Sequence, residues 1–411
     1  MHRDTLNRMR LPLLLLALFA LPALPQSPGA GLDRERLKLI RPRLQELVES
    51  QAIPGAVALV ARHGQVTLDV AGWRDVEGKK PMQKDSIFQI MSMTKNFTGV
   101  AIMMLVEDGK VELRRPVADY LPEFRNQMLE ERLPNGNLSI HAPAQLPTVA
   151  QLMSHTSGLA GDPDGELSDN PRTMRVPLAE AVRYYGRQHL QFEPGTRWRY
   201  SNMGIAALGR IIEAVSGEEY VHFIEAHLLT PLGMPDTFFF APEAKQDRIA
   251  LVYKHSGRKL VRAGDEILAG DAARYRSGAR YPAPEFGLYS TAPDLLNFYQ
   301  MLLDGGAYKG RRYLSRQSIE TMTRVFTPDV NPSGWLGGTG YGLTFEIVNK
   351  PEGTLLLHSP GTFGHGGAFG TEGWMDPHTD LIRIVMVQLS DGTGSQARSV
   401  VMQIGAAAVE R

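Results

Sequence analysis

The sequence contains no cysteine. This absence excludes disulfides, thiolate metal sites and a lipid-modified cysteine anchor. The chain also lacks an excess of one charge, because 44 Lys and Arg residues balance 44 Asp and Glu residues. The sequence also has no cluster of basic residues of the kind that binds nucleic acid. We therefore expect a small molecule or a peptide as the partner, and no nucleic acid.

A long hydrophobic run is missing as well. The apolar run Leu11–Leu24 is shorter than the roughly 20 residues that a membrane-spanning helix needs. Three arginines precede it and a small, turn-rich segment at 25–30 follows it, as in a secretory signal peptide. Removal of residues 1–26 would leave 41 basic and 43 acidic residues. We expect a periplasmic or secreted protein without a stable membrane anchor, and the sequence leaves the cleavage site open.

The order of helical and strand-like patterns predicts the fold class. Apolar residues recur at helical spacing between 32 and 52, and strand-like segments come mainly near the two ends of the remaining chain, at 55–61, 65–72, 342–348, 354–358, 367–375 and 381–389. The region between them is mostly helical. This order predicts an α+β fold in which helices flank a sheet, spanning residues 32–411, with a helical subdomain at about 114–290 inserted in it.

Ser92 and Lys95 stand three residues apart where a helical pattern begins. Apolar residues then recur from Phe97 to Leu105. Residues i and i+3 lie on one face of a helix, so the Lys95 amine would reach the Ser92 hydroxyl. A serine is a weak nucleophile unless a base takes its proton, and a desolvated lysine can be that base.

A second Ser-x-x-Lys pattern occurs at Ser256 and Lys259. There the Ser256-Gly257 pair indicates a turn between two short strands, which we interpret as chance. Because a four-residue pattern with two free positions is weak alone, the remaining parts of a site must be found elsewhere.

Two further segments supply candidates. Tyr200-x-Asn202 precedes a helical pattern: a phenol can move protons and an amide can orient substrate, but Tyr200 could simply pack and Asn202 could cap the helix. His365-Gly366-Gly367-Ala368 lies in a glycine-rich segment that enters a strand, where substrate can approach the backbone closely. It could equally be a turn before a bulged strand. His155, at a helix end, fits a structural role better than a catalytic one.

Taken in order, these motifs resemble the three active-site elements of the penicillin-recognising serine hydrolases, in particular the class C beta-lactamase-like branch. That family includes carboxylesterases, D-aminopeptidases, DD-peptidases and acyltransferases. The resemblance implies an antiparallel sheet flanked by helices with a mostly helical second subdomain, and neither a cofactor nor a metal. It implies acylation of Ser92, activation by Lys95, proton transfer by Tyr200, substrate binding by Asn202, His365, Gly366 and Gly367, and an oxyanion-hole amide at Ala368 beside that of Ser92. How Lys95 and Tyr200 divide the role of base stays open.

One departure from the family pattern bears on the substrate. His365 stands where beta-lactamases and DD-peptidases of the family usually carry a lysine, and an imidazole is mostly neutral near pH 7. We therefore expect an exported carboxylesterase or D-amino-acid peptide or amide hydrolase. The alternatives are a beta-lactamase or DD-peptidase, with Arg197 or Arg199 as the carboxylate-binding group, and a catalytically silent binding protein.

Overall fold

A computed structural model describes residues 31–264, 278–327, 337–392 and 394–410. The predicted signal peptide at 1–26 lies outside the described residues. Among the helices that are described, none combines the length and the hydrophobicity needed to cross a membrane.

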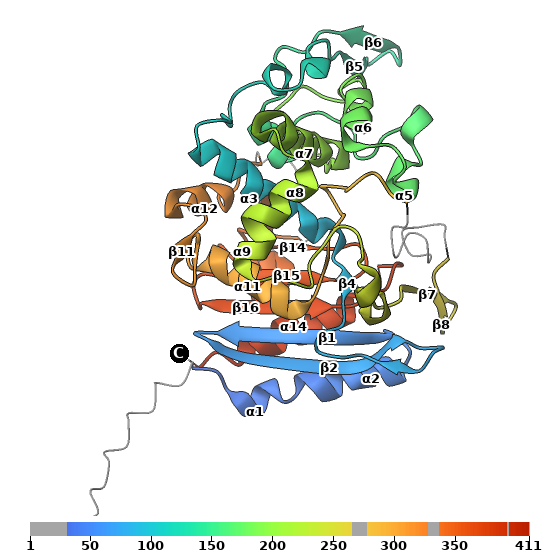
Figure 1. Ribbon diagram of the computed structural model, residues 1–411, viewed down its shortest axis with the longest axis vertical. Coiled ribbons are helices and arrows are strands. Elements are labelled where there is room, and N and C mark those ends of the chain that lie inside the picture. Colours follow the sequence, from blue (N-terminus) through green and yellow to red (C-terminus); the bar gives the residue numbers. More distant parts are fainter. Residues whose placement is uncertain (1–30, 265–277, 328–336, 393, 411) are drawn as a thin grey trace, which may run out of the picture.

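An eight-stranded antiparallel sheet is the centre of the molecule, and its strands come from both ends of the chain (Figure 1). Across the sheet they are β12 (Thr339–Tyr341), β13 (Glu346–Val348), β14 (Phe363–Gly366), β15 (Glu372–Asp376), β16 (Leu381–Met386), β1 (Gly55–Arg62), β2 (Gln65–Asp75) and β3 (Lys80–Pro81). Paired short strands elsewhere are β4 (Phe88–Gln89) with β9 (Tyr289–Ser290), β5 (Leu129–Arg132) with β6 (Leu138–His141), β7 (Tyr253–Ser256) with β8 (Lys259–Arg262), and β10 (Ala307–Tyr308) with β11 (Arg311–Arg312). The predicted α+β fold with an antiparallel sheet is confirmed.

Helices cover both faces of this sheet. The described α-helices are α1 (Arg34–Leu37), α2 (Ile40–Glu49), α3 (Thr94–Glu107), α4 (Val149–Met153), α5 (Asn170–Thr173), α6 (Leu178–Tyr185), α7 (Asn202–Ser216), α8 (Tyr220–Ile224), α9 (Thr230–Leu232), α11 (Ala292–Leu303), α12 (Arg316–Met322), α13 (Pro351–Thr354) and α14 (Ser395–Ala407). In Figure 1, α1, α2 and α14 lie at the β1–β2 end, α6, α7 and the β5–β6 hairpin lie at the far end, and α3 lies between α7 and the sheet.

Strand β1 is buried along its whole length because both of its faces are covered. Its odd positions Val57 and Leu59 join the large core that includes α3 and α11, whereas Ala58 and Val60 join a second core with α2 and α14. Successive side chains of a strand point to opposite faces, so an uninterrupted apolar sequence is what a strand covered on both faces requires.

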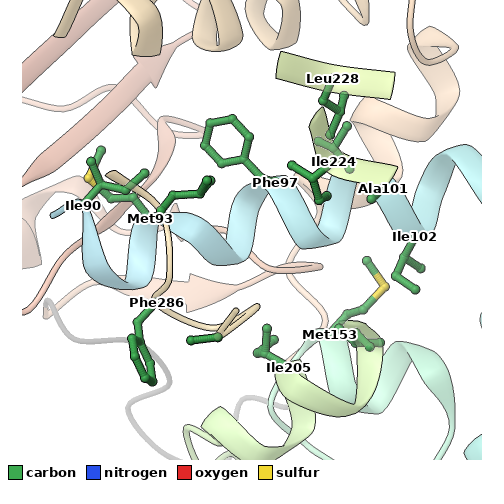
Figure 2. Packing of buried hydrophobic residues seen from close by; sticks show 14 of the residues in the cluster. Ile90, Met93, Phe97, Ala101, Ile102, Met153, Ile205, Ile224, Leu228 and Phe286 are labelled. Atoms are coloured by element: carbon green, nitrogen blue, oxygen red, sulfur yellow. The ribbon is translucent and has the colours of Figure 1, made fainter. Parts of the chain in front are cut away.

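Helix α3 crosses the middle of the molecule and is buried on nearly all sides. Figure 2 shows Ile224 and Leu228 on one side of it and Met153 and Ile205 on the other. Gly99 permits part of this packing, since a Cβ there would overlap the Thr344 side chain. This burial is the reason that the polar side chains in the first two turns of α3, from Thr94 to Thr98, are desolvated.

The helical prediction for 32–52 is confirmed in a divided form. Asp33 caps α1 by accepting a hydrogen bond from the Arg36 amide at 3.0 Å, and a second helix, α2, begins at Ile40. Pro42 lies in the first turn of α2, where its missing amide hydrogen removes no helical bond.

Several strand boundaries predicted near the C-terminus are wrong. Residues 354–358 form no strand, because Leu355 and Leu357 have φ angles of 55° and 56°, which no extended segment has. The segment 342–348 is not one strand but the turn and second strand of the β12–β13 pair. The strand predicted from 367 begins at Glu372, since Gly367 to Gly370 close a tight turn first. The last strand ends at Met386 rather than Leu389.

We predict that Leu59→Ala lowers the free energy of unfolding by about 2–5 kcal/mol, because it empties a fully buried position between β1 and the helical core. The matched control is Val66→Ala on β2, where the side chain is 47% exposed and the change should be within about 0.5 kcal/mol. Urea denaturation followed by circular dichroism measures both. Equal losses would contradict the assignment of β1 to the core.

Candidate active site

Ser92 lies on a tight turn between a short strand and α3. The 3-10 turn Met91–Met93 leads directly into the helix, and the Ile90 amide donates to the Leu288 carbonyl at 3.0 Å, which ties this turn to the segment before β9. Met91 has a φ angle of 50°. A left-handed conformation costs a residue with a side chain about 1–3 kcal/mol and is concentrated at functional sites. Ser92 therefore follows directly after a residue with a strained backbone conformation.

The side chain of Lys95 reaches back to Ser92. Its Nζ donates to the Ser92 Oγ at 3.1 Å and to the main-chain oxygen of Glu285 at 2.7 Å. Lys95 has no exposed surface, and burial lowers the pKa of its amine to about 7. Near neutral pH a large share of the amine is therefore uncharged and able to accept a proton.

Tyr200 covers the other side of the lysine. The Lys95 Nζ lies 4.6 Å from the centre of the Tyr200 ring. Burial raises the pKa of the Tyr200 phenol well above its usual value, although the neighbouring Ser92 hydroxyl acts in the opposite direction. Tyr200 is consequently a neutral phenol at rest, a proton donor rather than a standing base.

Asn202 is the first residue of α7, but it does not cap the helix. Ser201 is the cap, since its Oγ accepts from the Gly204 amide at 3.0 Å. The Asn202 side-chain amide donates to the Asp162 carboxylate at 2.7 Å, and its main-chain amide donates to the Gly161 carbonyl at 2.7 Å. Asn202 thus links the start of α7 to the irregular segment at 160–164.

His365 lies in β14 with both ring nitrogens engaged. Nδ1 is 2.6 Å from the Gly366 carbonyl oxygen, which can only accept, so Nδ1 carries the proton. Nε2 is therefore the acceptor for the Tyr341 hydroxyl at 2.7 Å. Burial, with the charge of Lys95, lowers the pKa of His365 to about 3. The imidazole is neutral and cannot replace a fixed cation.

The residues after His365 form a turn against the Ser92 segment. The Gly367 amide donates to the Thr371 carbonyl at 2.7 Å, and the Thr371 hydroxyl donates to the Ile90 carbonyl at 3.1 Å. A Cβ at Gly367 would overlap both the Thr371 hydroxyl and the Ile90 carbonyl. Glycine is required here because two backbones approach closely.

A cavity of about 460 Å³ opens between these elements. Its lining includes Ser92, Tyr200, His365, Gly366, Gly367 and Ala368, together with Glu346, Glu372, Trp374 and Arg398. All predicted site residues therefore line this cavity except Lys95, which contacts Ser92 from the buried side, and Asn202, which binds Asp162. Arg197 lines a different cavity, of about 800 Å³, beside the β5–β6 hairpin.

The guanidinium that lines the Ser92 cavity, that of Arg398, is already paired with a carboxylate. Arg398 lies 2.8 Å from one Glu372 oxygen, and the Trp374 indole donates to the other at 3.1 Å. Since Glu346 is also a carboxyl group in this lining, the described charged side chains that line the cavity provide no surplus of positive charge.

His155 packs against Tyr200 and binds the main chain of the next residue, Ser201. Its Nδ1 accepts the Ser201 amide at 3.1 Å, and its ring centre lies 4.3 Å from that of Tyr200. Burial holds the pKa of His155 well below its usual value, so the ring is neutral. This is the structural role that the sequence favoured.

Sequence reasoning missed Asp162, Tyr341 and Glu285. Asp162 and Tyr341 contact site residues that lie far away in the chain, and no local pattern indicates such pairs. Glu285 had a visible signal, because it is the one charged residue in the segment 281–292, which is otherwise apolar or uncharged.

A serine, a buried amine and a phenol at one cavity beside an antiparallel sheet define a class of serine hydrolases. The Beta-lactamase family model matches residues 40–405, so the chain belongs to this family. The resemblance inferred from the three motifs is confirmed, and the protein is a serine hydrolase.

Particular relatives agree with this class. Protein Rv1367c of Mycobacterium tuberculosis is 30% identical over 359 residues, covering 84% of this chain and 88% of that protein. Esterase EstB of Burkholderia gladioli is 28% identical over 352 residues, covering 80% and 85%. The solved structure of EstCE1, a hydrolase with promiscuous acyltransferase activity, has a TM-score of 0.74 at 23% identity, covers 92% of this chain and 98% of that one, and shows the common fold.

We predict that Gly367→Ala lowers kcat/KM for a p-nitrophenyl ester on the order of a hundredfold, because the added methyl group displaces β14 from the Ser92 turn. Gly204→Ala is the matched control, since the nearest atom to a Cβ there is 3.4 Å away. Circular dichroism should show both variants folded. Equal activity in the two variants would contradict a close approach at Gly367.

Proposed function

We propose that this protein is an exported carboxylesterase that forms an acyl-enzyme on Ser92. The observation that carries the proposal is the contact between the buried Lys95 amine and the Ser92 hydroxyl at 3.1 Å. Export is inferred from the basic residues and the apolar run at the start of the chain.

In the first step the neutral Lys95 amine takes the Ser92 proton while Oγ attacks the ester carbonyl carbon. The negative oxygen that forms lies where the backbone amides of Ser92 and Ala368 can donate to it. When the carbon–oxygen bond to the leaving group breaks, the alkoxide takes a proton from the Tyr200 phenol, which Lys95 replenishes. This sequence assigns the base to Lys95 and the acid to Tyr200, in agreement with the directions of their pKa shifts.

Water then attacks the acyl-enzyme along the reverse route. Its proton passes to the neutral Lys95 amine, the bond between the acyl carbon and Ser92 Oγ breaks, and Oγ takes that proton back from Lys95. The products are a carboxylic acid and an alcohol, and the enzyme returns to its starting protonation.

The cavity composition supports uncharged esters over beta-lactams as substrates. A beta-lactam carries a carboxylate beside the scissile amide. His365 is neutral, and Arg398 is bonded to Glu372, so no described cavity residue offers that carboxylate a free positive charge. The similarity to esterase EstB agrees with this preference.

We predict that Ser92→Ala lowers p-nitrophenyl acetate hydrolysis at least about a thousandfold, because the nucleophile is lost. Ser256→Ala is the matched control: Ser256 ends β7 at the turn of the β7–β8 hairpin, and its loss should leave the rate nearly unchanged. A fluorophosphonate probe with mass spectrometry should place the adduct on Ser92. Labelling elsewhere would contradict Ser92 as the nucleophile, and the absence of labelling would favour a silent binding protein.

We also predict that the wild-type enzyme hydrolyses short p-nitrophenyl esters faster than nitrocefin or D-amino-acid amides. Glu372→Gln should shift the ester-to-nitrocefin ratio of kcat/KM toward nitrocefin by roughly 1.5–3 kcal/mol, because it releases Arg398 for a hydrogen bond to the carboxylate. Glu213→Gln breaks the Arg210–Glu213 pair away from this cavity and is the control. A wild type that prefers nitrocefin would contradict the substrate class.

A further inference from the structure

Glu285 is a buried carboxyl group that the proposed chemistry does not use. Its residue is 2% exposed, and it lies on the segment that crosses the first turn of α3. Figure 2 shows the neighbouring Phe286 on this segment, close to Met93 at the start of the helix. The Glu285 main chain contacts the catalytic amine directly, with 2.7 Å between its oxygen and the Lys95 Nζ.

The carboxyl group is only partly satisfied. Its Oε1 accepts the Tyr281 hydroxyl at 2.8 Å. Its Oε2 is buried and has no hydrogen-bond partner among the residues that the structure describes. An unpartnered buried carboxylate oxygen destabilises a fold, so stability does not account for an acid at this position.

The phenols and imidazoles near Lys95 and Glu285 are neutral around pH 7. Burial raises the pKa values of the phenols and lowers those of the imidazoles, namely Tyr185, Tyr200, Tyr220, Tyr281, His155 and His365. Two further carboxyl groups lie nearby. Glu346 acts on Tyr200 but is not among the charges that act on Lys95. Asp162 acts on Lys95 from an exposed segment, where water and salt screen its charge. Glu285 is the stronger influence, since its charge outweighs that of Asp162 in its effect on Lys95.

The two buried groups affect each other in opposite directions. Burial raises the pKa of Glu285 to about 7, while the Lys95 charge lowers it. The Glu285 carboxylate in turn opposes the fall that burial causes in the pKa of Lys95. Ionised Glu285 therefore favours the protonated amine, which is inactive as a base.

We propose that Glu285 is a positioning residue for Lys95: its main-chain oxygen fixes the amine beside Ser92, and its buried carboxylate retains a proton on that amine and so sets the lower pH limit of activity. The inference rests on the proposed function, because it requires Lys95 to act as the base for Ser92.

The test is the pH dependence of kcat/KM for p-nitrophenyl acetate. The wild-type enzyme should lose activity as the pH falls through about 7, since the amine becomes protonated. Glu285→Gln keeps the backbone oxygen and an acceptor for Tyr281 but removes the negative charge. The amine then loses its proton at lower pH, so the acid limb should move down by about one pH unit, which is the low end of the effect of a nearby opposite charge.

Two variants serve as controls. Glu285→Asp keeps a carboxylate and should leave the acid limb close to that of the wild type. Glu225→Gln removes another glutamate whose pKa burial raises but whose charge does not act on Lys95, and it should not move the limb. A residue with a merely structural role would change stability or kcat without moving the limb, so thermal unfolding is measured in parallel.

Tyr281→Phe keeps the inference testable if Glu285→Gln does not fold. Loss of the Tyr281 hydrogen bond makes the Glu285 carboxylate harder to form, so the acid limb should again move to lower pH, by less. If the wild-type enzyme labels at Ser92 but the acid limb does not move in the variants, the inference is overturned and the proposed function stands. A wild type that does not label at Ser92 would overturn the proposed function, and this inference with it.

Discussion

The exclusion of water from the Lys95 amine is the constraint on which the site depends. An ammonium ion in an apolar surround is unfavourable, so the amine tends to release its proton, and a neutral amine can activate Ser92. The structure achieves this with a helix that is buried on nearly all sides. A carbonyl oxygen and an aromatic face hold the amine in place without forming a close ion pair. A carboxylate in direct contact would bind the proton too firmly for the amine to act as a base.

A layer of neutral polar rings around the lysine follows from the same constraint. His155 and His365 both hold a single proton, each fixed by a hydrogen bond from the main chain or to it. Tyr200 and Tyr341 pack against His155 with ring centres 4.3 Å and 4.7 Å away. Charged groups in this layer would change the proton affinity of Lys95, whereas neutral rings provide contacts and hydrogen bonds and leave it low.

Local patterns predicted the parts of the structure that local geometry determines. The Ser92–Lys95 spacing predicted a contact within one turn of chain, and Ser256-Gly257 predicted a hairpin turn. The strand predicted at 354–358 failed because a short apolar run fits a helix end or a loop as well as a strand. Here a proline at the start of α13 directs the chain into a helical turn.

The partners of the site residues could not be predicted, for a related reason. Asn202 binds Asp162 and His365 binds Tyr341, and the two residues of each pair are 40 and 24 positions apart. Only the packing of whole elements brings them together. Glu285 is more instructive, because a lone acid in an apolar segment contradicts its surroundings. Such local conflicts are expected at functional or strained positions.

Strand β14 leads into the turn that contacts the Ser92 segment, and it also carries a side chain that lines the cavity. Its last residues lead into the turn that meets the Ser92 segment through Thr371 and Ile90, so the same contact positions the backbone at Ala368 relative to Ser92. The same strand presents His365 to the cavity, and the adjacent strand β15 begins with Glu372, opposite Gly366. A neutral imidazole and a neutralised guanidinium therefore lie beside a fixed catalytic centre. His365 and Glu372, which determine the charge that the cavity offers, thus lie opposite each other's neighbours on two adjacent strands, and the first of these strands also leads into the contact with the Ser92 segment.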